Sequence, residues 1–361
     1  MASGLTIALD AMGGDKGPEV VVHGADVALE RAPDLSFILV GDETRIAAAL
    51  SKTKRLAKSN PEILHTDKAI ASDEKPSVAF RTGKGSSMWV AIEQVKTGKA
   101  TCVVSAGNTG ALMAIAKLLL RTVPGIDRPA IASFFPTRRG ESAMLDLGAN
   151  IECDARNLVE FALMGEIFAR TVLGLERPLV GLLNVGSEEQ KGSESLRDAA
   201  ATLRKLDELS FDFHGFIEGD DIAAGTVDVI VTDGFSGNIA LKTAEGTARL
   251  TGQFLRDAFR SSLISKIGYL LARNAVGQLR QRMDPRRYNG AVFLGLNGIT
   301  VKSHGGTDAL GFANAIGVAA DMAQYDFIEQ VKLDLAELKL KNTEERPASD
   351  GPAEPTVVAT A

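Results

Sequence analysis

Short apolar runs alternate with longer amphipathic stretches along most of the chain. Each apolar run leads into Gly, Asn or Asp; the clearest examples are LTIALDAMGGD from Leu5, LSFILVGDE from Leu35, TCVVSAGNTG from Thr101, PLVGLLNVGSEE from Pro178 and VDVIVTDGFSGN from Val227. Continuous apolar runs of this length are typical of strands buried on both faces. Their alternation with helical stretches predicts an α/β fold with a mostly parallel sheet.

The polar, glycine-rich segments fall where these predicted strands end. In parallel α/β sheets, ligands bind outside the carboxyl ends of the strands. We therefore expect these segments to converge on a single cleft.

Two segments depart from the alternating pattern. Residues 249–287 have no strand signal and hold nine Lys or Arg residues against two acidic ones. Their apolar positions recur with helical spacing and are flanked by basic residues, which predicts a basic amphipathic helical projection. Residues 342–361 contain three prolines and no periodicity, so a disordered tail is expected there. The rest, 1–341, is expected to form one α/β catalytic domain carrying the projection.

Composition and charge exclude several classes of protein. The 361 residues are 45% hydrophobic, enough for a sizeable core, and the formal net charge of -6 disfavours a general nucleic-acid binder. No run of eighteen apolar residues predicts a membrane span, and the N-terminus becomes charged too early for a signal peptide. Only Cys102 and Cys153 are present, without a CxxC pair, and the four histidines are scattered. We expect no metal, no coenzyme and a reducing cytoplasm.

Two glycine-rich segments are candidate anion sites. DAMGGD, residues 10–15, follows a strand, and its paired glycines allow successive N–H groups to form an anion-binding nest. The alternative is an ordinary strand-to-helix turn. SAGNTGAL, residues 105–112, opens a helix near Thr109, and a helix N-terminus attracts phosphate. Plain capping by Asn108 or Thr109 is the alternative there.

Further candidates lie in four other segments. DGFSGN, residues 233–238, holds more polar groups and glycines than a cap requires. Lys191 follows a predicted strand and is either a counter-charge for phosphate or a solvated loop residue. RTGKGSSM, residues 81–88, fails both nucleotide-loop templates but retains possible phosphate donors. His304, beside a glycine pair, either faces the cleft or is a structural histidine. The candidate phosphate- and substrate-binding residues are Asp10, Gly13, Gly14, Asp15, Lys84, Ser86, Ser87, Thr109, Asp233, Gly237 and His304.

Taken together and in order, DAMGGD, SAGNTGAL, LDLGAN, GLLNVGSEEQKG, TDGFSGN and LKTAEG resemble the phosphate acyltransferases of bacterial phospholipid synthesis. The resemblance covers residues 5–330. It implies an α/β/α sandwich related to phosphotransacetylases and isocitrate dehydrogenases, and a homodimer. It also implies conversion of acyl-acyl carrier protein and inorganic phosphate into acyl phosphate. Such enzymes are cytoplasmic and contact the membrane peripherally through a helical projection.

The resemblance places the family's active-site lysine and asparagine at Lys191 and Asn238. Two departures accompany it: GFIEGDD has Phe216 and Asp220 where the family usually has Asn and Arg, and the segment around Lys84 has one lysine fewer. Phosphorolysis of a thioester needs placement of phosphate and donors for the oxyanion rather than a strong base or a metal. We expect Lys191 and the 10–15 turn to hold phosphate, while Asn238 and Asn108 polarise the carbonyl.

The basic projection has three interpretations: a contact with anionic membrane, a docking site for the acidic carrier protein, or a dimer-packing surface. The candidate contact residues are Arg260, Leu263, Ile264, Lys266, Ile267, Leu270, Leu271 and Arg273. Rival functions are a phosphotransacetylase acting on short acyl-CoA and a catalytically silent membrane scaffold. A nucleotide-dependent dehydrogenase is disfavoured, because GxGxxG is absent.

Overall fold

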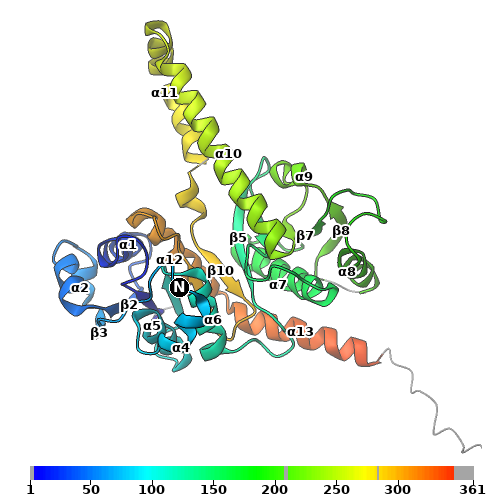
Figure 1. Cartoon of the computed structure of the whole chain (residues 1–361), viewed down its shortest axis with the longest axis horizontal. Coiled ribbons are helices and arrows are strands. Elements are labelled where there is room, and N and C mark those ends of the chain that lie inside the picture. The colour runs from blue at the N-terminus through cyan, green and yellow to red at the C-terminus, as the bar shows by residue number, and fades with distance from the viewer. Residues whose placement is uncertain (1–3, 207–209, 283, 345–361) are drawn as a thin grey trace, which may run out of the picture.

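The computed structural model describes residues 4–206, 210–282 and 284–344. Figure 1 shows two halves of strands and helices that share one sheet, with a long helical hairpin projecting away from both halves. The predicted α/β architecture with a mostly parallel sheet is confirmed by this arrangement.

The sheet has eleven strands, in the order β3-β2-β1-β4-β11-β10-β5-β6-β9-β7-β8 among the described residues. The strands are β1 (Thr6–Asp10), β2 (Ser36–Gly41), β3 (Glu62–His65), β4 (Cys102–Ser105), β5 (Ala130–Pro136), β6 (Glu141–Leu145), β7 (Leu179–Leu183), β8 (Asp212–Ile217), β9 (Val229–Val231), β10 (Ala291–Leu294) and β11 (Ile299–Lys302). All pairs at the two ends of the sheet are parallel.

Three successive antiparallel pairs lie in the middle of the sheet: β11 with β10, β10 with β5, and β5 with β6. They reverse the direction of the chain, so β6, β7, β8 and β9 run opposite to β1, β2, β3, β4 and β11. The expectation that all strand ends meet at one edge is therefore wrong. The carboxyl ends of the strands lie in two groups, at opposite edges of the sheet.

Helices cover both faces of the sheet. They are α1 (Pro18–Arg31), α2 (Glu43–Leu50), α3 (Leu56–Ser59), α4 (Pro76–Thr82), α5 (Ser87–Lys96), α6 (Thr109–Leu120), α7 (Ala155–Leu173), α8 (Glu194–Lys205), α9 (Gly219–Ala224), α10 (Gly234–Arg260), α11 (Leu263–Arg282), α12 (Ala309–Gln324) and α13 (Phe327–Glu344), with a 3₁₀ turn at Pro285–Tyr288. Several start at side-chain caps of the kind that satisfies free N–H groups.

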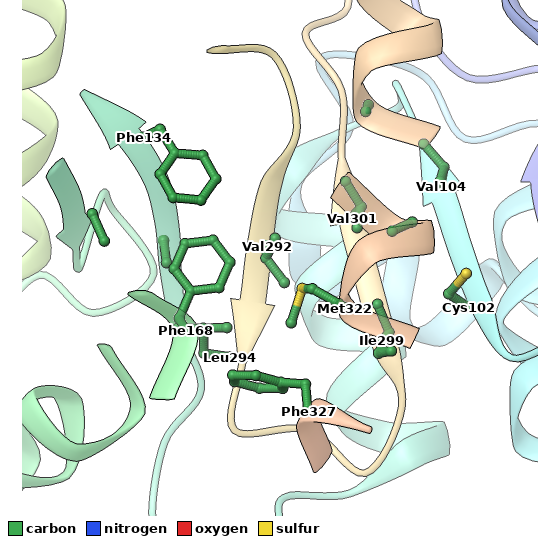
Figure 2. Close-up of a cluster of buried hydrophobic side chains, with 14 of the residues drawn as sticks. Cys102, Val104, Phe134, Phe168, Val292, Leu294, Ile299, Val301, Met322 and Phe327 are labelled. Carbon is green, nitrogen blue, oxygen red and sulfur yellow. The ribbon is translucent and has the colours of Figure 1, made fainter. Parts of the chain in front are cut away.

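Alternate residues of each strand enter two separate cores, one on each face of the sheet. In β1, Ile7 and Leu9 join the core under α1, α7 and α12, whereas Ala8 joins the core under α5 and α6. Figure 2 shows the first core where the two halves of the molecule meet, with Phe168 stacked on Phe134 at a centroid distance of 4.9 Å. Two cores flanking one sheet make the predicted three-layer sandwich.

The helical projection is an antiparallel pair formed by α10 and α11 (Figure 1). It begins earlier than residue 249, because α10 starts at Gly234 and continues without a break. The rings of Phe259 and Tyr269 pack edge to face near its tip, 5.3 Å apart. None of the helices formed by the described residues has the length and apolar character needed to cross a lipid bilayer.

The predicted tail is shorter than expected at its start. Helix α13 extends to Glu344, so residues 342–344 are helical rather than disordered. The preceding residues are mostly good helix formers such as Leu, Lys and Glu, and no proline follows until Pro347. The rest of the predicted tail, 345–361, lies outside the described residues.

Candidate functional site

Three glycine-rich turns meet at the carboxyl ends of β1, β4 and β11. We call residues 10–15, 105–110 and 302–306 together the first cluster. Asp10 is buried, and its carboxylate accepts hydrogen bonds from the Ser105 hydroxyl at 2.7 Å and from the N–H of Met12 at 3.3 Å. The Asp15 N–H donates to the carbonyl of Gly305 at 3.0 Å, which ties the first turn to the third.

Glycine is required where these turns touch. A Cβ on Gly13 would lie 2.7 Å from the backbone nitrogen of Gly107 and 2.7 Å from the Asp10 carboxylate. One on Gly14 would lie 3.0 Å from the carbonyl oxygen of Gly305, and Gly14 also has a φ of 87°. The paired glycines thus let three backbones approach one another closely. The N–H groups of Met12, Gly13 and Asp15 donate to acceptors within the protein, so the anion-binding nest stays a prediction.

A half-buried lysine lies inside this cluster. The Nζ of Lys302 donates to the carbonyl of Ala106 at 3.3 Å and to the carbonyl of Ser303. Burial lowers the pKa of Lys302 to about 8, although Asp10 and Asp15 favour its charged form. Burial also raises the pKa of Asp10, against hydrogen bonds from Ser105 and Ser87. The first cluster therefore combines a half-buried cation with a buried carboxyl.

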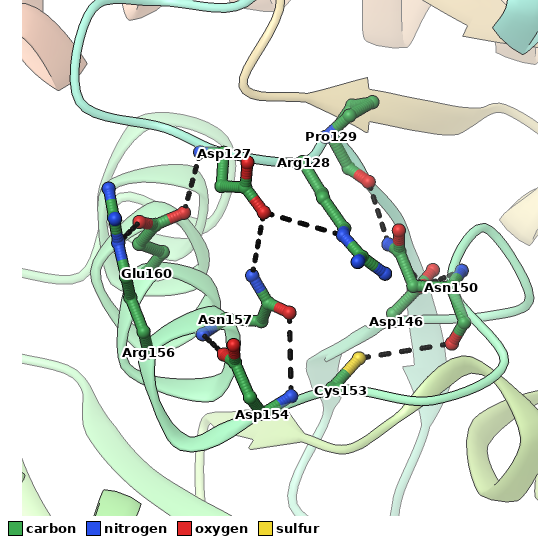
Figure 3. Close-up of polar contacts among 10 residues, drawn as sticks. All are labelled: Asp127, Arg128, Pro129, Asp146, Asn150, Cys153, Asp154, Arg156, Asn157 and Glu160. Atoms are coloured by element: carbon green, nitrogen blue, oxygen red, sulfur yellow. Dashed lines mark hydrogen bonds and ion pairs between the residues drawn. The ribbon is translucent and has the colours of Figure 1, made fainter.

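A second cluster lies at the opposite edge of the sheet, where β6 and β9 end. We define it as residues 146–150 and 233–238. The buried carboxylate of Asp146 accepts hydrogen bonds from the backbone N–H groups of Ile131, Gly148, Ala149 and Asn150 and from the Asn150 side chain. Burial nevertheless raises its pKa. Figure 3 shows Asn150 between Asp146 and the carbonyl of Pro129.

The start of α10 packs directly on this loop. The N–H of Gly234 donates to the Asn150 carbonyl at 2.7 Å, and a Cβ on Gly237 would overlap the carbonyl oxygen of Asp146. The exposed side chain of Asn238 lies against Gly148, which has a φ of 121°. LDLGAN and DGFSGN, distant in sequence, therefore form one structural unit that presents Asn238.

Lys191 lies in the loop that follows β7. Because β7 is the parallel neighbour of β9, this loop lies at the same edge of the sheet as Asn238, which follows β9. The Asn184 side chain donates to the carbonyl of Lys191 at 3.2 Å and fills the space beside Gly192. The Lys191 side chain is exposed. The structure therefore holds the backbone of this loop in place while its lysine faces solvent.

Helix α10 connects the two clusters. Asn238 and Lys242 are one turn apart on the same face of α10, about 6 Å along its axis. Burial is the main cause of the lowered pKa of Lys302, and the positive charge of Lys242 lowers it further, so the charge of the second turn of α10 acts on the first cluster. Gly14 and Asn108 belong to one cluster, and Asn238 and Lys191 lie at the other edge. The expectation of one pocket is thus replaced by two clusters bordering the same stretch of helix.

Asn108 does not fit the role expected of it. Its side-chain oxygen caps α6 by accepting from the N–H of Ala111 at 2.9 Å. Its side-chain nitrogen donates to the carbonyls of Ser72 and Glu74, both at 2.9 Å. Both amide hydrogens are therefore engaged, so the predicted role of Asn108 toward a substrate carbonyl would require its amide to leave these acceptors. The amide instead holds residues 72–74 against the start of α6.

Other predicted residues divide between the first cluster and the surrounding framework. Ser87 is buried and hydrogen-bonds to Asp10, whereas the buried hydroxyl of Ser86 caps α5. Lys84 is exposed, and no side-chain contact joins it to the first cluster in the described part of the chain. His304 is exposed; its Nδ1 accepts from the Gly306 N–H at 3.1 Å. Thr109 is exposed at the first turn of α6.

Asp233 and the two departures from the family pattern also have clear positions. Asp233 caps α10, accepting from the N–H of Ser236 at 2.8 Å. Phe216 is buried in β8, at the end of the sheet, and Asp220 occupies the first turn of α9. Neither replacement lies in the first or the second cluster.

The sequence reasoning missed two central residues, Lys302 and Asp146. Lys302 directly precedes the SHGG segment in which only His304 was considered, so a lysine ending a short β-branched strand was the available signal. Asp146 stands within LDLGAN, quoted only for resemblance. Within residues 4–206, 210–282 and 284–344, no three His, Cys, Asp or Glu side chains gather as metal ligands would.

Comparison with known proteins assigns the chain to a family. A family model described as fatty acid synthesis protein matches residues 5–330. The chain is 65% identical to the phosphate acyltransferase of Rhodospirillum centenum over 339 residues, covering 94% of this chain and 95% of the relative. It is 58% identical to that of Rhodospirillum rubrum, covering 94% and 97%. The chain belongs to the phosphate acyltransferase family. It is therefore an acyltransferase of fatty acid and lipid synthesis, as the motifs predict.

Solved structures with a similar fold are more distant. A phosphotransacetylase from Streptococcus pyogenes superposes with a TM-score of 0.59 at 18% identity, covering 90% of this chain and 95% of that one. One from Staphylococcus aureus gives 0.56 at 19% identity, covering 88% and 94%. These similarities confirm the phosphotransacetylase-like fold.

Proposed function

We propose that this phosphate acyltransferase transfers a fatty acyl group from the thioester of acyl carrier protein to inorganic phosphate, forming acyl phosphate. Phosphate attacks the thioester carbonyl, the carbon–sulfur bond breaks, and the carrier leaves as a thiolate. Near neutral pH, phosphate is already substantially dianionic, and a thiol with a pKa of about 8.5 leaves readily. The reaction therefore depends on placement and on oxyanion donors more than on acid–base catalysis.

The observation that carries this proposal is the arrangement of the two clusters along α10. The first supplies the N–H groups at the start of α6, next to the glycine turns, which suit an anion. The second presents the Asn238 amide, a donor that suits a carbonyl oxygen on which negative charge develops. Lys191 lies at the same edge of the sheet as Asn238, and its positive charge is proposed to balance the negative charge of the inorganic phosphate.

A hydroxylamine trap tests this function. The enzyme is incubated with palmitoyl-acyl carrier protein or acetyl-CoA, with and without phosphate, and acyl hydroxamate is measured. We expect phosphate-dependent hydroxamate from the long-chain carrier substrate. Hydroxamate from acetyl-CoA but not from palmitoyl-acyl carrier protein would support a phosphotransacetylase instead. No hydroxamate from either donor would support a silent scaffold.

The hairpin of α10 and α11 is proposed as a peripheral contact with anionic membrane. Near its tip, Leu263, Ile264 and Leu271 are each more than three-quarters exposed, and Arg260 and Lys266 are exposed beside them. Apolar side chains flanked by cations suit a lipid headgroup region. Flotation with anionic vesicles tests this, with the double variant Ile267→Glu/Leu271→Glu expected to lose binding.

Two other partners remain outcomes of the same experiment. If the double variant floats normally but its KM for acyl carrier protein rises, the hairpin docks the carrier. If it sediments as a monomer while the wild type sediments as a dimer, the hairpin joins two copies of the chain. The proposed homodimer is tested directly by that sedimentation measurement.

A further inference from the structure

Three polar side chains form a row across adjacent strands of the first cluster. Lys302, the last residue of β11, is in register with Ser105 of β4, and Ser105 is in register with Asp10 of β1. All three stand at the edge of the sheet from which the glycine turns leave. The lysine is thus placed by the core of the fold rather than by a flexible loop.

The surroundings of Lys302 differ from those of a structural ion pair. In the described part of the chain, no carboxylate oxygen lies within 4 Å of its Nζ, and its acceptors are the carbonyls of Ala106 and Ser303. Asp10 instead receives its hydrogen bonds from hydroxyl and N–H groups. A half-buried cation without a paired carboxylate has lost part of its hydration, and such groups concentrate at functional sites.

A second ammonium approaches from α10. Lys242, ion-paired with Glu245 at 3.0 Å, is close enough to Lys302 to repel its charge. Ala106 lies three residues before the start of α6, where the N–H groups of Thr109 and Gly110 have no acceptor among the described residues. One bound anion would reduce the repulsion between the two cations and would accept hydrogen bonds from the free helix N–H groups.

We propose that Lys302 contacts the inorganic phosphate substrate and holds it at the start of α6, with Lys242 as the second cation. This inference rests on the proposed function, and it gives the central phosphate contact to Lys302 rather than to Lys191. Lys302 forms no covalent bond; it binds the nucleophile in position while the phosphate oxygen attacks the thioester.

Binding of inorganic phosphate, measured by calorimetry without an acyl donor, tests the contact directly. Loss of a charged hydrogen bond in Lys302→Met should weaken phosphate binding roughly 10- to 100-fold and raise the KM for phosphate similarly. Lys96→Met, an exposed lysine on α5, serves as the matched control and should change neither value. Unaltered phosphate binding in a folded Lys302→Met enzyme would overturn the inference.

The pH dependence separates this role from a merely structural one. Burial is the main cause of the lowered pKa of Lys302; Asp10 and Asp15 act against it, and the charge of Lys242 lowers the pKa further. Since the protonated lysine binds phosphate, affinity should fall as pH rises through about 8. In Lys242→Met, the repulsion is gone and this fall should move to higher pH. In Lys302→Arg, the side chain stays charged throughout this pH range, so the fall in phosphate affinity that wild type shows near pH 8 should disappear.

These outcomes remain distinct from a failure of the proposed function. The ionisation of phosphate itself contributes equally in all variants, so only differences between variants count. If Lys302→Met does not fold, the exposed Lys242→Met decides, and an unshifted pH profile there would refute the inference. If the wild type binds phosphate but forms no acyl hydroxamate, the proposed function fails while the phosphate site stands.

Discussion

The two clusters are each organised around a buried aspartate, but the partners of these aspartates differ. Asp146 is surrounded by N–H donors alone, four from the backbone and one from Asn150. Asp10 accepts from the Ser105 hydroxyl and the Met12 N–H, and its charge acts on the cation Lys302. Asp146 therefore fixes a loop that supports α10, whereas Asp10 belongs to a set of groups whose charge can respond to a ligand.

The largest expected effect comes from exchanging each aspartate for asparagine. In Asp146→Asn, an NH₂ group would face N–H donors, leaving two or more of them without an acceptor. We expect a loss of about 4 kcal/mol in the free energy of unfolding. In Asp10→Asn, hydroxyls can rotate to accept, so the loss should be about 1 kcal/mol. Urea unfolding measures both, and equal losses would remove the distinction between the clusters.

How far the sequence predicts this arrangement depends on which strands are recognised. The five apolar runs that lead into glycine-rich turns correspond to β1, β2, β4, β7 and β9, and they are sufficient for the α/β fold. β5, β6, β10 and β11 were not among them, and three of their pairings are the antiparallel ones that reverse the sheet. Direction depends on pairing between distant segments, which the pattern within one strand does not contain.

The same limit explains the site residues. The glycines of DAMGGD were predicted from local turn chemistry, and their close approaches agree with it. The contacts of Asn108 were not predicted, because the acceptors of its amide, Ser72 and Glu74, lie more than thirty residues away. Lys302 was missed because its burial and its proximity to Lys242 arise only from tertiary packing.

Glu166 is a third buried carboxyl outside both clusters, and its contribution to stability depends on pH. Burial raises the pKa of Glu166 to about 7, against a hydrogen bond from Ser210 and the charge of Arg170; the nearby Asp334 raises it further. Because the folded pKa exceeds the unfolded one, this contribution to stability is full below about pH 4.5 and is lost as pH rises to about 7. The loss should be about 3 kcal/mol.

Glu166→Gln tests this contribution. The variant should show a flatter stability profile between pH 4.5 and 7 than the wild type, measured by urea unfolding at several pH values. A wild-type stability that rises over this pH interval would contradict the prediction.

A smaller effect is expected from the glycines of α10. In Gly237→Ala the new methyl group would overlap the carbonyl oxygen of Asp146, so the variant should lose about 2 kcal/mol of stability. Gly246 lies on the same helix with nothing within 4 Å of its Cβ position. Gly246→Ala should therefore gain up to about 1 kcal/mol. Thermal unfolding of both variants measures the difference, and equal effects would exclude close packing of α10 on the 146–150 loop.

The smallest expected effect concerns the two asparagines. Asn108→Ala removes a helix cap and should cost about 1 kcal/mol of stability. Its kcat should fall much less than that of Asn238→Ala, because its amide is committed to the backbone. If both variants lost turnover equally, Asn108 would act on the substrate carbonyl despite its contacts with the backbone.

The phosphate saturation curves of two variants test most directly whether one cluster binds phosphate and the other acts on the thioester carbonyl. Initial rates of acyl hydroxamate formation are measured over a range of phosphate concentrations for Asn238→Ala and Lys302→Met. Asn238→Ala should lower kcat by roughly 10²–10³-fold with an unchanged KM for phosphate. Lys302→Met should chiefly raise that KM. The reverse pattern, or the same change in both variants, would contradict the assignment of the carbonyl to one cluster and of phosphate to the other.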